Sequence, residues 1–159
     1  MNVDRESIRL GLKAALESDE FKSVVSNIYA EKNDLENVAF LNEVYPCLKW
    51  APQTFPCAEI GIPRGTNSNN TSVYVDYTYA VSLYVHDNGS DEERLEQVIE
   101  RFVRAMQDFF VSRPNLLPFV AECSITVGDE DYSPLTRVTE YSMPFIKSGM
   151  LELFIGVRR

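Results

Sequence analysis

The chain has 159 residues, of which 45% are hydrophobic, and its formal net charge at pH 7 is -9. This length and this composition predict one folded domain over residues 1–159 and argue against a disordered chain. The acidic balance argues against sequence-specific binding of nucleic acid, because proteins that bind it hold phosphates through many Lys and Arg side chains.

No membrane or export segment is predicted. Met1 to Asp19 interleave charged and apolar residues, so this stretch lacks the apolar run of a signal peptide. No apolar run approaches the roughly 20 residues that cross a bilayer. Cys47, Cys57 and Cys123 show no C-x-x-C spacing. We therefore expect buried thiols and no disulfide framework.

The N-terminal segment shows the periodicity of helices. Apolar residues recur at helical spacing from Ile8 to Leu16 and again from Phe21 to Ile28, with a break in phase at Ser18-Asp19. This pattern predicts two short helices between residues 4 and 29, the first capped by Asp4. From Asn33 to Pro52 no period holds, so an irregular segment is expected there.

Two strands and a polar loop are predicted next. Phe55 to Ile62 predicts a short strand whose prolines suggest an edge or a strand-start position. The turn-forming residues from Pro63 to Ser72 predict a mobile loop. The clearest strand runs from Val73 to His86, where one alternating face is apolar and belongs to the core. The other face is mixed, which fits a neighbouring subunit or pore, or equally an ordinary solvated face.

A long helix follows. Ser90 and Glu93 have the spacing of a capping box, and the helix should end before Pro114. Its apolar stripe should lie across the core face of the sheet, and it consists of Leu95, Val98, Ile99, Phe102, Met106, Phe109 and Phe110.

The C-terminal third predicts two more strands, Val120 to Val127 and Met150 to Val157. The connection between them, Gly128 to Ser148, is expected to be a long functional loop that carries an acidic turn. The predicted fold class is therefore α+β: a mostly antiparallel four-stranded sheet with the long helix and the N-terminal helices packed on one face.

We find no motif that indicates an enzyme, a cofactor or a metal site. His86 is the only histidine, so one conceivable Cys–His dyad remains, without an orienting third group. Asp129-Glu130-Asp131 lacks the spacing of a calcium loop and is better explained as a solvated acidic turn. No glycine-rich nucleotide fingerprint is present.

Four segments, taken with the order of the predicted elements, carry a family resemblance. They are Phe55-Pro56-Cys57-Ala58-Glu59-Ile60, Tyr77 to Val85, Asp91-Glu92-Glu93-Arg94-Leu95 and Gly149-Met150-Leu151-Glu152-Leu153-Phe154-Ile155. Over about its whole length the chain resembles the tail terminator (tail completion) proteins of tailed phages. The resemblance implies a structural protein that forms a closed ring, commonly hexameric, on the last ring of the tail tube. Such a ring stops tube polymerisation and presents a surface for head–tail joining.

The resemblance also implies partners and locations. The partners would be the tail tube protein, a neck or head-completion protein and further copies of the chain, while DNA would pass through the ring without sequence-specific binding. The protein would lie in the host cytoplasm during assembly and then in the virion, at the junction of tail and neck. The candidate contact or pore residues are Arg64, Asn67, Asn69, Asn70, Asp129, Glu130, Asp131 and Tyr132.

Other classes of protein stay open at this point. A neck or head-completion (connector) protein of a tailed phage has the same size and acidity and differs in its partner. A small cytoplasmic adaptor domain would stay monomeric. A small enzyme that uses Cys57 or Cys123 as its nucleophile would show an activity that alkylation abolishes.

Overall fold

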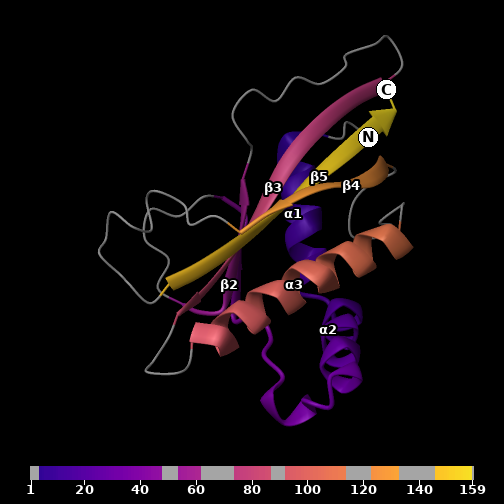
Figure 1. The fold of residues 1–159 in the computed structure, drawn as a ribbon. Helices are drawn as coiled ribbons and strands as arrows, with labels where there is room; N and C mark the ends of the chain where they lie inside the picture. Colours follow the sequence, from indigo (N-terminus) through magenta and orange to yellow (C-terminus); the bar gives the residue numbers. More distant parts are fainter. Residues whose placement is uncertain are drawn as a thin grey trace.

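The computed structural model describes residues 4–47, 54–61, 74–86, 92–113, 123–132 and 146–158. The fold is α+β, as predicted. In chain order its elements are α1 (Arg5–Leu16), α2 (Asp19–Glu31), the 3-10 turn η1 (Leu35–Asn37), β1 (Glu43–Tyr45), β2 (Cys57–Gly61), β3 (Tyr74–His86), α3 (Glu92–Ser112), β4 (Cys123–Asp131) and β5 (Ile146–Arg158) (Figure 1).

The sheet has five strands in the order β1-β2-β3-β5-β4, so the predicted four-stranded sheet was wrong in this detail. The additional strand, β1, pairs parallel with β2, whereas the other three pairs are antiparallel. It lies within the segment that was expected to be irregular, and its middle residue, Val44, is buried in the core. Three residues are too few to show an alternating pattern, which explains why the sequence did not indicate this strand.

The position of β2 also differs in part from the prediction. β2 lies between β1 and β3, so it is not an edge strand. Pro56 directly precedes it, which is the strand-start position that the sequence offered as the alternative.

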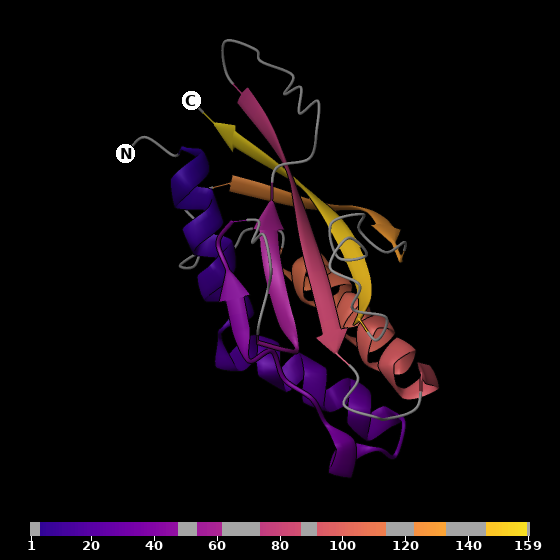
Figure 2. The same ribbon diagram turned by 90° about the vertical axis from the view of Figure 1, so that its left-hand side faces the viewer.

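All three helices lie on one side of the sheet, as predicted (Figures 1 and 2). α1 contacts β1 and β2, α3 crosses β3, β5 and β4, and α2 packs on α3. A single cluster of buried apolar side chains draws members from all three helices and all five strands. Every residue of the predicted α3 stripe is buried in this cluster.

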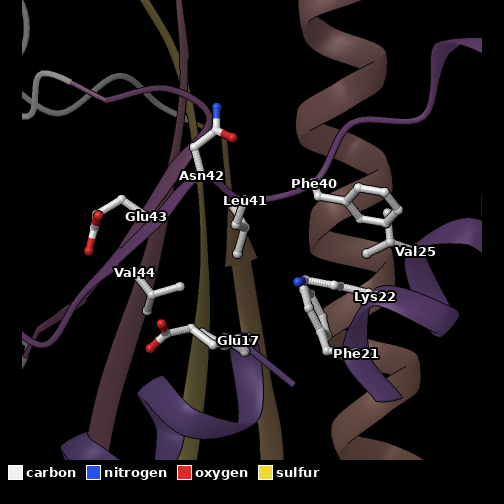
Figure 3. Close-up of a pocket in the computed structure, with 10 residues that line it drawn as sticks. Glu17, Phe21, Lys22, Val25, Phe40, Leu41, Asn42, Glu43 and Val44 are labelled. Carbon is white, nitrogen blue, oxygen red and sulfur yellow. The ribbon is translucent and has the colours of Figure 1, made fainter. Parts of the chain in front are cut away.

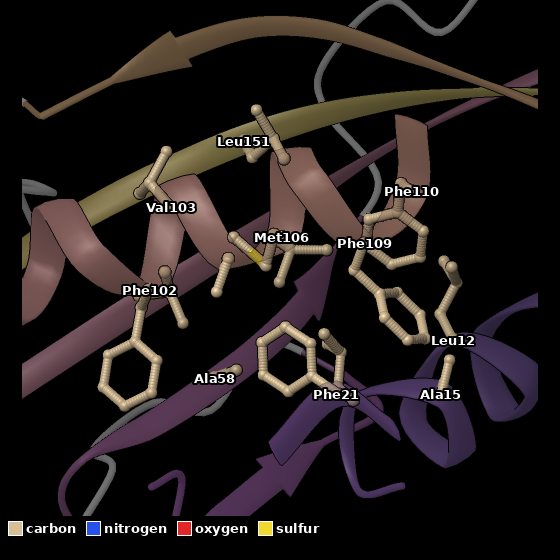
Figure 4. Close-up of a cluster of buried hydrophobic side chains, with 14 of the residues drawn as sticks. Leu12, Ala15, Phe21, Ala58, Phe102, Val103, Met106, Phe109, Phe110 and Leu151 are labelled. Atoms are coloured by element: carbon tan, nitrogen blue, oxygen red, sulfur yellow. The ribbon is translucent and has the colours of Figure 1, made fainter. Parts of the chain in front are cut away.

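Phe109 of α3 lies near the middle of the core, at the point where the helices meet (Figure 4). Its ring packs edge-on against Phe21 of α2, with centroids 5.6 Å apart, and against Phe110, with centroids 5.3 Å apart. Edge-to-face pairs of this kind add about 0.5–1.5 kcal/mol each beyond the area they bury. The Phe21–Phe109 pair, which spans the two helices, helps to fix the angle at which α2 crosses α3.

The two N-terminal helices are separate, as the break in hydrophobic phase predicted. The carboxylate of Asp4 accepts a hydrogen bond from the Ser7 amide at 2.8 Å and caps α1. The hydroxyl of Ser18 accepts one from the Phe21 amide at 3.2 Å and caps α2. Each cap satisfies an amide that the first helical turn leaves without a partner.

Asp34 ties the segment after α2 to α3. Its Oδ2 accepts hydrogen bonds from Arg94 Nη1 and Arg101 Nη1, both at 2.6 Å. The guanidinium of Arg101 also lies over the Tyr29 ring, 4.6 Å from its centroid. Hydrogen bonds from Arg101, Asn37 and Arg94 hold the pKa of Asp34 well below its usual range. The carboxylate therefore stays charged while the two helices remain packed.

The face of the sheet turned away from these three helices, here called the second face, has two unlike halves. At β2 and β3 it is buried, although polar groups contribute to it. Its buried residues there are Cys57, Glu59, Ala80, Ser82 and Tyr84. At β4 and β5 it is exposed, with Ser124, Thr126 and Phe154 open to solvent. On β3, the second-face residues whose burial is described are not uniformly solvated, and the exposed region lies on the next two strands of the sheet, β5 and β4.

Candidate protein-contact site

Four of the eight predicted contact residues lie in the part of the chain that the structure describes. Asp129, Glu130 and Asp131 lie in β4, and Tyr132 follows the strand directly. The remaining candidates lie outside the described residues; they are Arg64, Asn67, Asn69 and Asn70.

The acidic run belongs to a strand and not to a loop, which corrects the predicted connection from Gly128 to Ser148. β4 continues to Asp131 and β5 already begins at Ile146. Val127 pairs with Leu153 and Glu130 with Leu151, so Gly128 and Asp129 stand opposite Glu152 alone. This β-bulge adds one residue, shifts the alternation and lets pairing resume beyond it. In the sequence the broken alternation at Gly128 looked like the end of the strand.

Phe154 of β5 covers Gly128 on the second face. A Cβ built on Gly128 would lie 2.4 Å from Phe154 Cε2, so the ring occupies the space that a side chain would need. Thr126 stands directly opposite Phe154 in the strand register. Aromatic rings that cover a glycine in a neighbouring strand shield its backbone and help to fix the register. Phe154 is nevertheless 41% exposed.

Glu130 is directed to α3 and is not simply solvated. Its Oε2 accepts a hydrogen bond from Gln107 Nε2 at 3.0 Å and one from the Tyr132 hydroxyl at 3.0 Å. The pKa of Tyr132 is raised to about 12, first by burial and then by the hydrogen bond to Glu130 and the charges of Glu130 and Glu100, which disfavour a phenolate. The Tyr132 ring lies beside Gly149, since a Cβ there would be 3.4 Å from Tyr132 Cδ1.

We call the exposed region formed by Ser124, Thr126, Asp129 and Phe154 the β4–β5 surface. It combines an aromatic ring, two hydroxyl groups and a carboxylate on neighbouring strands. In the sheet formed by the described residues β4 is also an edge strand, so its main-chain groups can pair with an extended segment of another chain. This chemistry fits contact with a protein.

Open pockets are found among the described residues. One of about 180 Å³ lies between the corner of α1 and α2 and the strand β1 (Figure 3). It is lined by Leu16, Glu17, Phe21, Lys22, Val25, Phe40, Leu41, Asn42, Glu43 and Val44. A second pocket of about 310 Å³ lies between α2 and α3 and is lined by Ile28, Lys32, Gln97, Glu100, Arg101 and Arg104. Neither lining contains a cysteine, a serine or a histidine that could act as a nucleophile or its base.

The cysteines differ in access. The Cys57 thiol is buried, and Cys47 is exposed. Within the described ranges, no three side chains of His, Cys, Asp or Glu gather closely enough to bind a metal ion. No helix in the part of the chain that the structure describes is long and apolar enough to cross a membrane.

Two residues of the site were missed by sequence reasoning. Phe154 was treated as one residue of a strand, although it alternates with the inward-facing Leu153 and Ile155 and so had to point to the second face. Gln107 lies beside the apolar stripe of α3, and no sequence pattern connects it with Glu130, which is 23 positions away.

No protein-family model matches this chain, and no curated protein matches it. The fold class and the β4–β5 surface are therefore the findings from which a function has to be argued.

Proposed function

We propose that this chain is a structural protein of a tailed-phage virion that caps the tail tube, stops its polymerisation and forms the tail-side surface for head–tail joining. The observation that carries the proposal is the β4–β5 surface. There Phe154 is 41% exposed on the second face, on which none of the three described helices lies. An exposed aromatic ring beside polar groups is typical of a protein contact. The resemblance of the chain to tail terminators adds the identity of the partner.

The two sides of the subunit differ in a way that suits a cap. A capping protein must bind the last tube ring with one surface and offer no equivalent surface for the next tube subunit. Here one side of the sheet carries the helices, and the other carries the β4–β5 surface with its exposed Ser124, Thr126 and Phe154. Docking through the β4–β5 surface would leave a helical surface outward, which differs in shape and chemistry from the one that was buried.

The charge of the chain fits a ring through which DNA passes. Its formal net charge of -9 would repel phosphates rather than hold them, so DNA would cross without sequence-specific binding. The same charge keeps free subunits soluble before assembly. In a closed ring, rotational symmetry limits the number of copies, so the cap itself does not grow.

The experiment is a measurement of molar mass by light scattering, on the purified protein alone and mixed with soluble tail-tube subunits of the same phage. We expect a closed ring, either in the free protein or only after tube subunits are added. The variant Phe154→Ser should lose the complex with tube subunits. The matched control is Val111→Ser, because Val111 is 68% exposed but lies at the end of α3.

A second variant tests the other predicted contact. Replacement of residues 64–72 with a short Gly-Ser link should weaken the complex if this segment also contacts the tube. A monomer that ignores tube subunits would contradict the proposal. A complex with the connector below the portal, in place of the tube, would identify the chain as a neck or head-completion protein.

A further inference from the structure

We infer that Glu130 is a positioning residue and not a contact residue: it fastens the end of β4 to α3 and thereby sets how Asp129 and Phe154 meet the partner. This inference takes only the identity of the partner from the proposed function. The fastening itself is a property of the isolated chain and can be measured without any partner.

The first step is the geometry of the Glu130 carboxylate. A single oxygen, Oε2, accepts from Gln107 Nε2 and from the Tyr132 hydroxyl, both at 3.0 Å. Gln107 belongs to α3 and Tyr132 directly follows β4. The carboxylate therefore links the end of β4 both to the helix and to the residue after the strand. These two donors take up two of the roughly four acceptor positions of the carboxylate, and both belong to the chain itself.

The second step is the place of this fastening in the strand. Pairing with β5 shifts between Val127 and Glu130, and beyond the bulge only Glu130 and Asp131 are paired. β4 is an edge strand, so its second side has no neighbouring strand in the described sheet. A short paired end beyond a bulge on an edge strand opens easily unless side chains secure it. Glu130 supplies that restraint.

The third step concerns the neighbours of the fastening. Tyr132 lies beside Gly149 of β5, at a position where α3 comes so close that a Cβ on Gly149 would be 2.6 Å from Ile99 Cγ2. One edge of the Tyr132 ring, at Cδ1, therefore lies against this tightly packed part of the core, while the residue as a whole is 43% exposed. Asp129, in the bulge, is exposed. All three acidic residues of β4 are exposed, but Glu130 is hydrogen-bonded to α3 through Gln107, and we assign it the positioning role and Asp129 the contact with the partner.

Three variants separate the two roles. Glu130→Gln keeps an acceptor oxygen of the same shape and removes the charge, whereas Glu130→Ala removes both. Asp129→Asn removes a charge outside the fastening. We expect Glu130→Gln to bind tail-tube subunits within about twofold of the parent protein, and Glu130→Ala and Asp129→Asn to bind about tenfold more weakly, a loss of the size of one charge-assisted hydrogen bond. Equal losses for Glu130→Gln and Glu130→Ala would overturn the inference, because they would show that the charge itself makes the contact.

A second readout uses the chain alone. Hydrogen exchange, followed by mass spectrometry, should be faster over residues 128–131 in Glu130→Ala and in Tyr132→Phe, and unchanged in Glu130→Gln and in the control Glu20→Ala on α2. Unchanged exchange in Glu130→Ala would overturn the inference whatever the tube binding shows. Failure of the parent protein to bind tube subunits would instead contradict the proposed function, while the exchange data would still decide the role of Glu130.

Discussion

The ring of Phe154 covers Gly128 so closely that a Cβ on residue 128 would lie 2.4 Å from Phe154 Cε2. The contact joins the two features that define the β4–β5 surface, the bulge in β4 and the exposed aromatic ring of β5. It also shows why a glycine stands at the bulge, since a side chain there would push the ring aside. The surface and the bulge are therefore one structural unit.

Gly149 and Gly128 should respond differently to alanine. At Gly149 the new Cβ would be 2.6 Å from Ile99 Cγ2 inside the core, so Gly149→Ala should lower the free energy of unfolding by about 1–3 kcal/mol. At Gly128 the new Cβ would meet the end of an exposed ring that can turn and would lie 3.1 Å from Glu152 Cβ, a tight contact that a small shift relieves, so Gly128→Ala should cost about 1 kcal/mol or less. Urea unfolding measures both. Addition of Ile99→Ala to Gly149→Ala should cost less than the sum of the single changes, and strict additivity would contradict the close contact.

Asp34 should stabilise the fold in a pH-dependent way. Its pKa is held below the unfolded value of about 3.9, so its contribution is complete above that pH and is lost as the pH falls through the folded pKa. Asp34→Asn should therefore lower the unfolding midpoint at pH 7, and the difference from the parent should shrink below about pH 4. Unfolding by urea at a series of pH values checks this. Glu31→Gln, which removes an exposed partner of Arg104, is the control and should change little.

The buried tyrosines should make the free energy of unfolding depend on pH in the alkaline range. Burial raises the pKa of Tyr79 to about 12 from the ordinary value of 10.0, and it raises the pKa of Tyr84 further. A raised folded pKa contributes stability that is complete below the unfolded pKa and is lost as the pH rises through the folded pKa. The free energy of unfolding should thus be level up to about pH 9 and fall above about pH 10.

Tyr79→Phe isolates one of these groups. Its hydroxyl donates to the Arg5 carbonyl at 3.1 Å, so the variant should lose about 1 kcal/mol at neutral pH. It should also show a shallower decline above pH 10, because one group no longer titrates. An unchanged alkaline slope would contradict the burial of this phenol.

The elements with long periodic patterns could be predicted from the sequence. The stripe on α3 and the alternation of Leu151, Leu153 and Ile155 on β5 each repeat often enough to fix both the element and its buried side. The break at Ser18 separated the first two helices correctly, because the local hydrogen bonds of a cap are set by nearby residues.

The remaining features depend on distant residues. β1 is a strand only because Val44 can pair with Ala58 and reach the core. Pairing beyond the bulge at Gly128 is determined by β5, and no sequence pattern within β4 predicts it. The contact of Glu130 with α3 likewise needs Gln107, whose position next to β4 follows from helix packing. The acidic residues Asp129 and Glu130 look alike in the sequence, but we assign them different roles in the folded chain.

The most direct test of the capping function is the length of tail tubes polymerised from purified tube subunits with and without this protein, measured by electron microscopy of negatively stained samples. We predict that the protein shortens the tubes in proportion to its concentration and that labelled protein lies at one end of each tube. Tubes grown with Phe154→Ser should be as long as tubes grown without the protein. Val111→Ser should shorten the tubes as the parent does. Tubes of unaltered length, with no protein at their ends, would contradict the assignment of this chain as a tail cap.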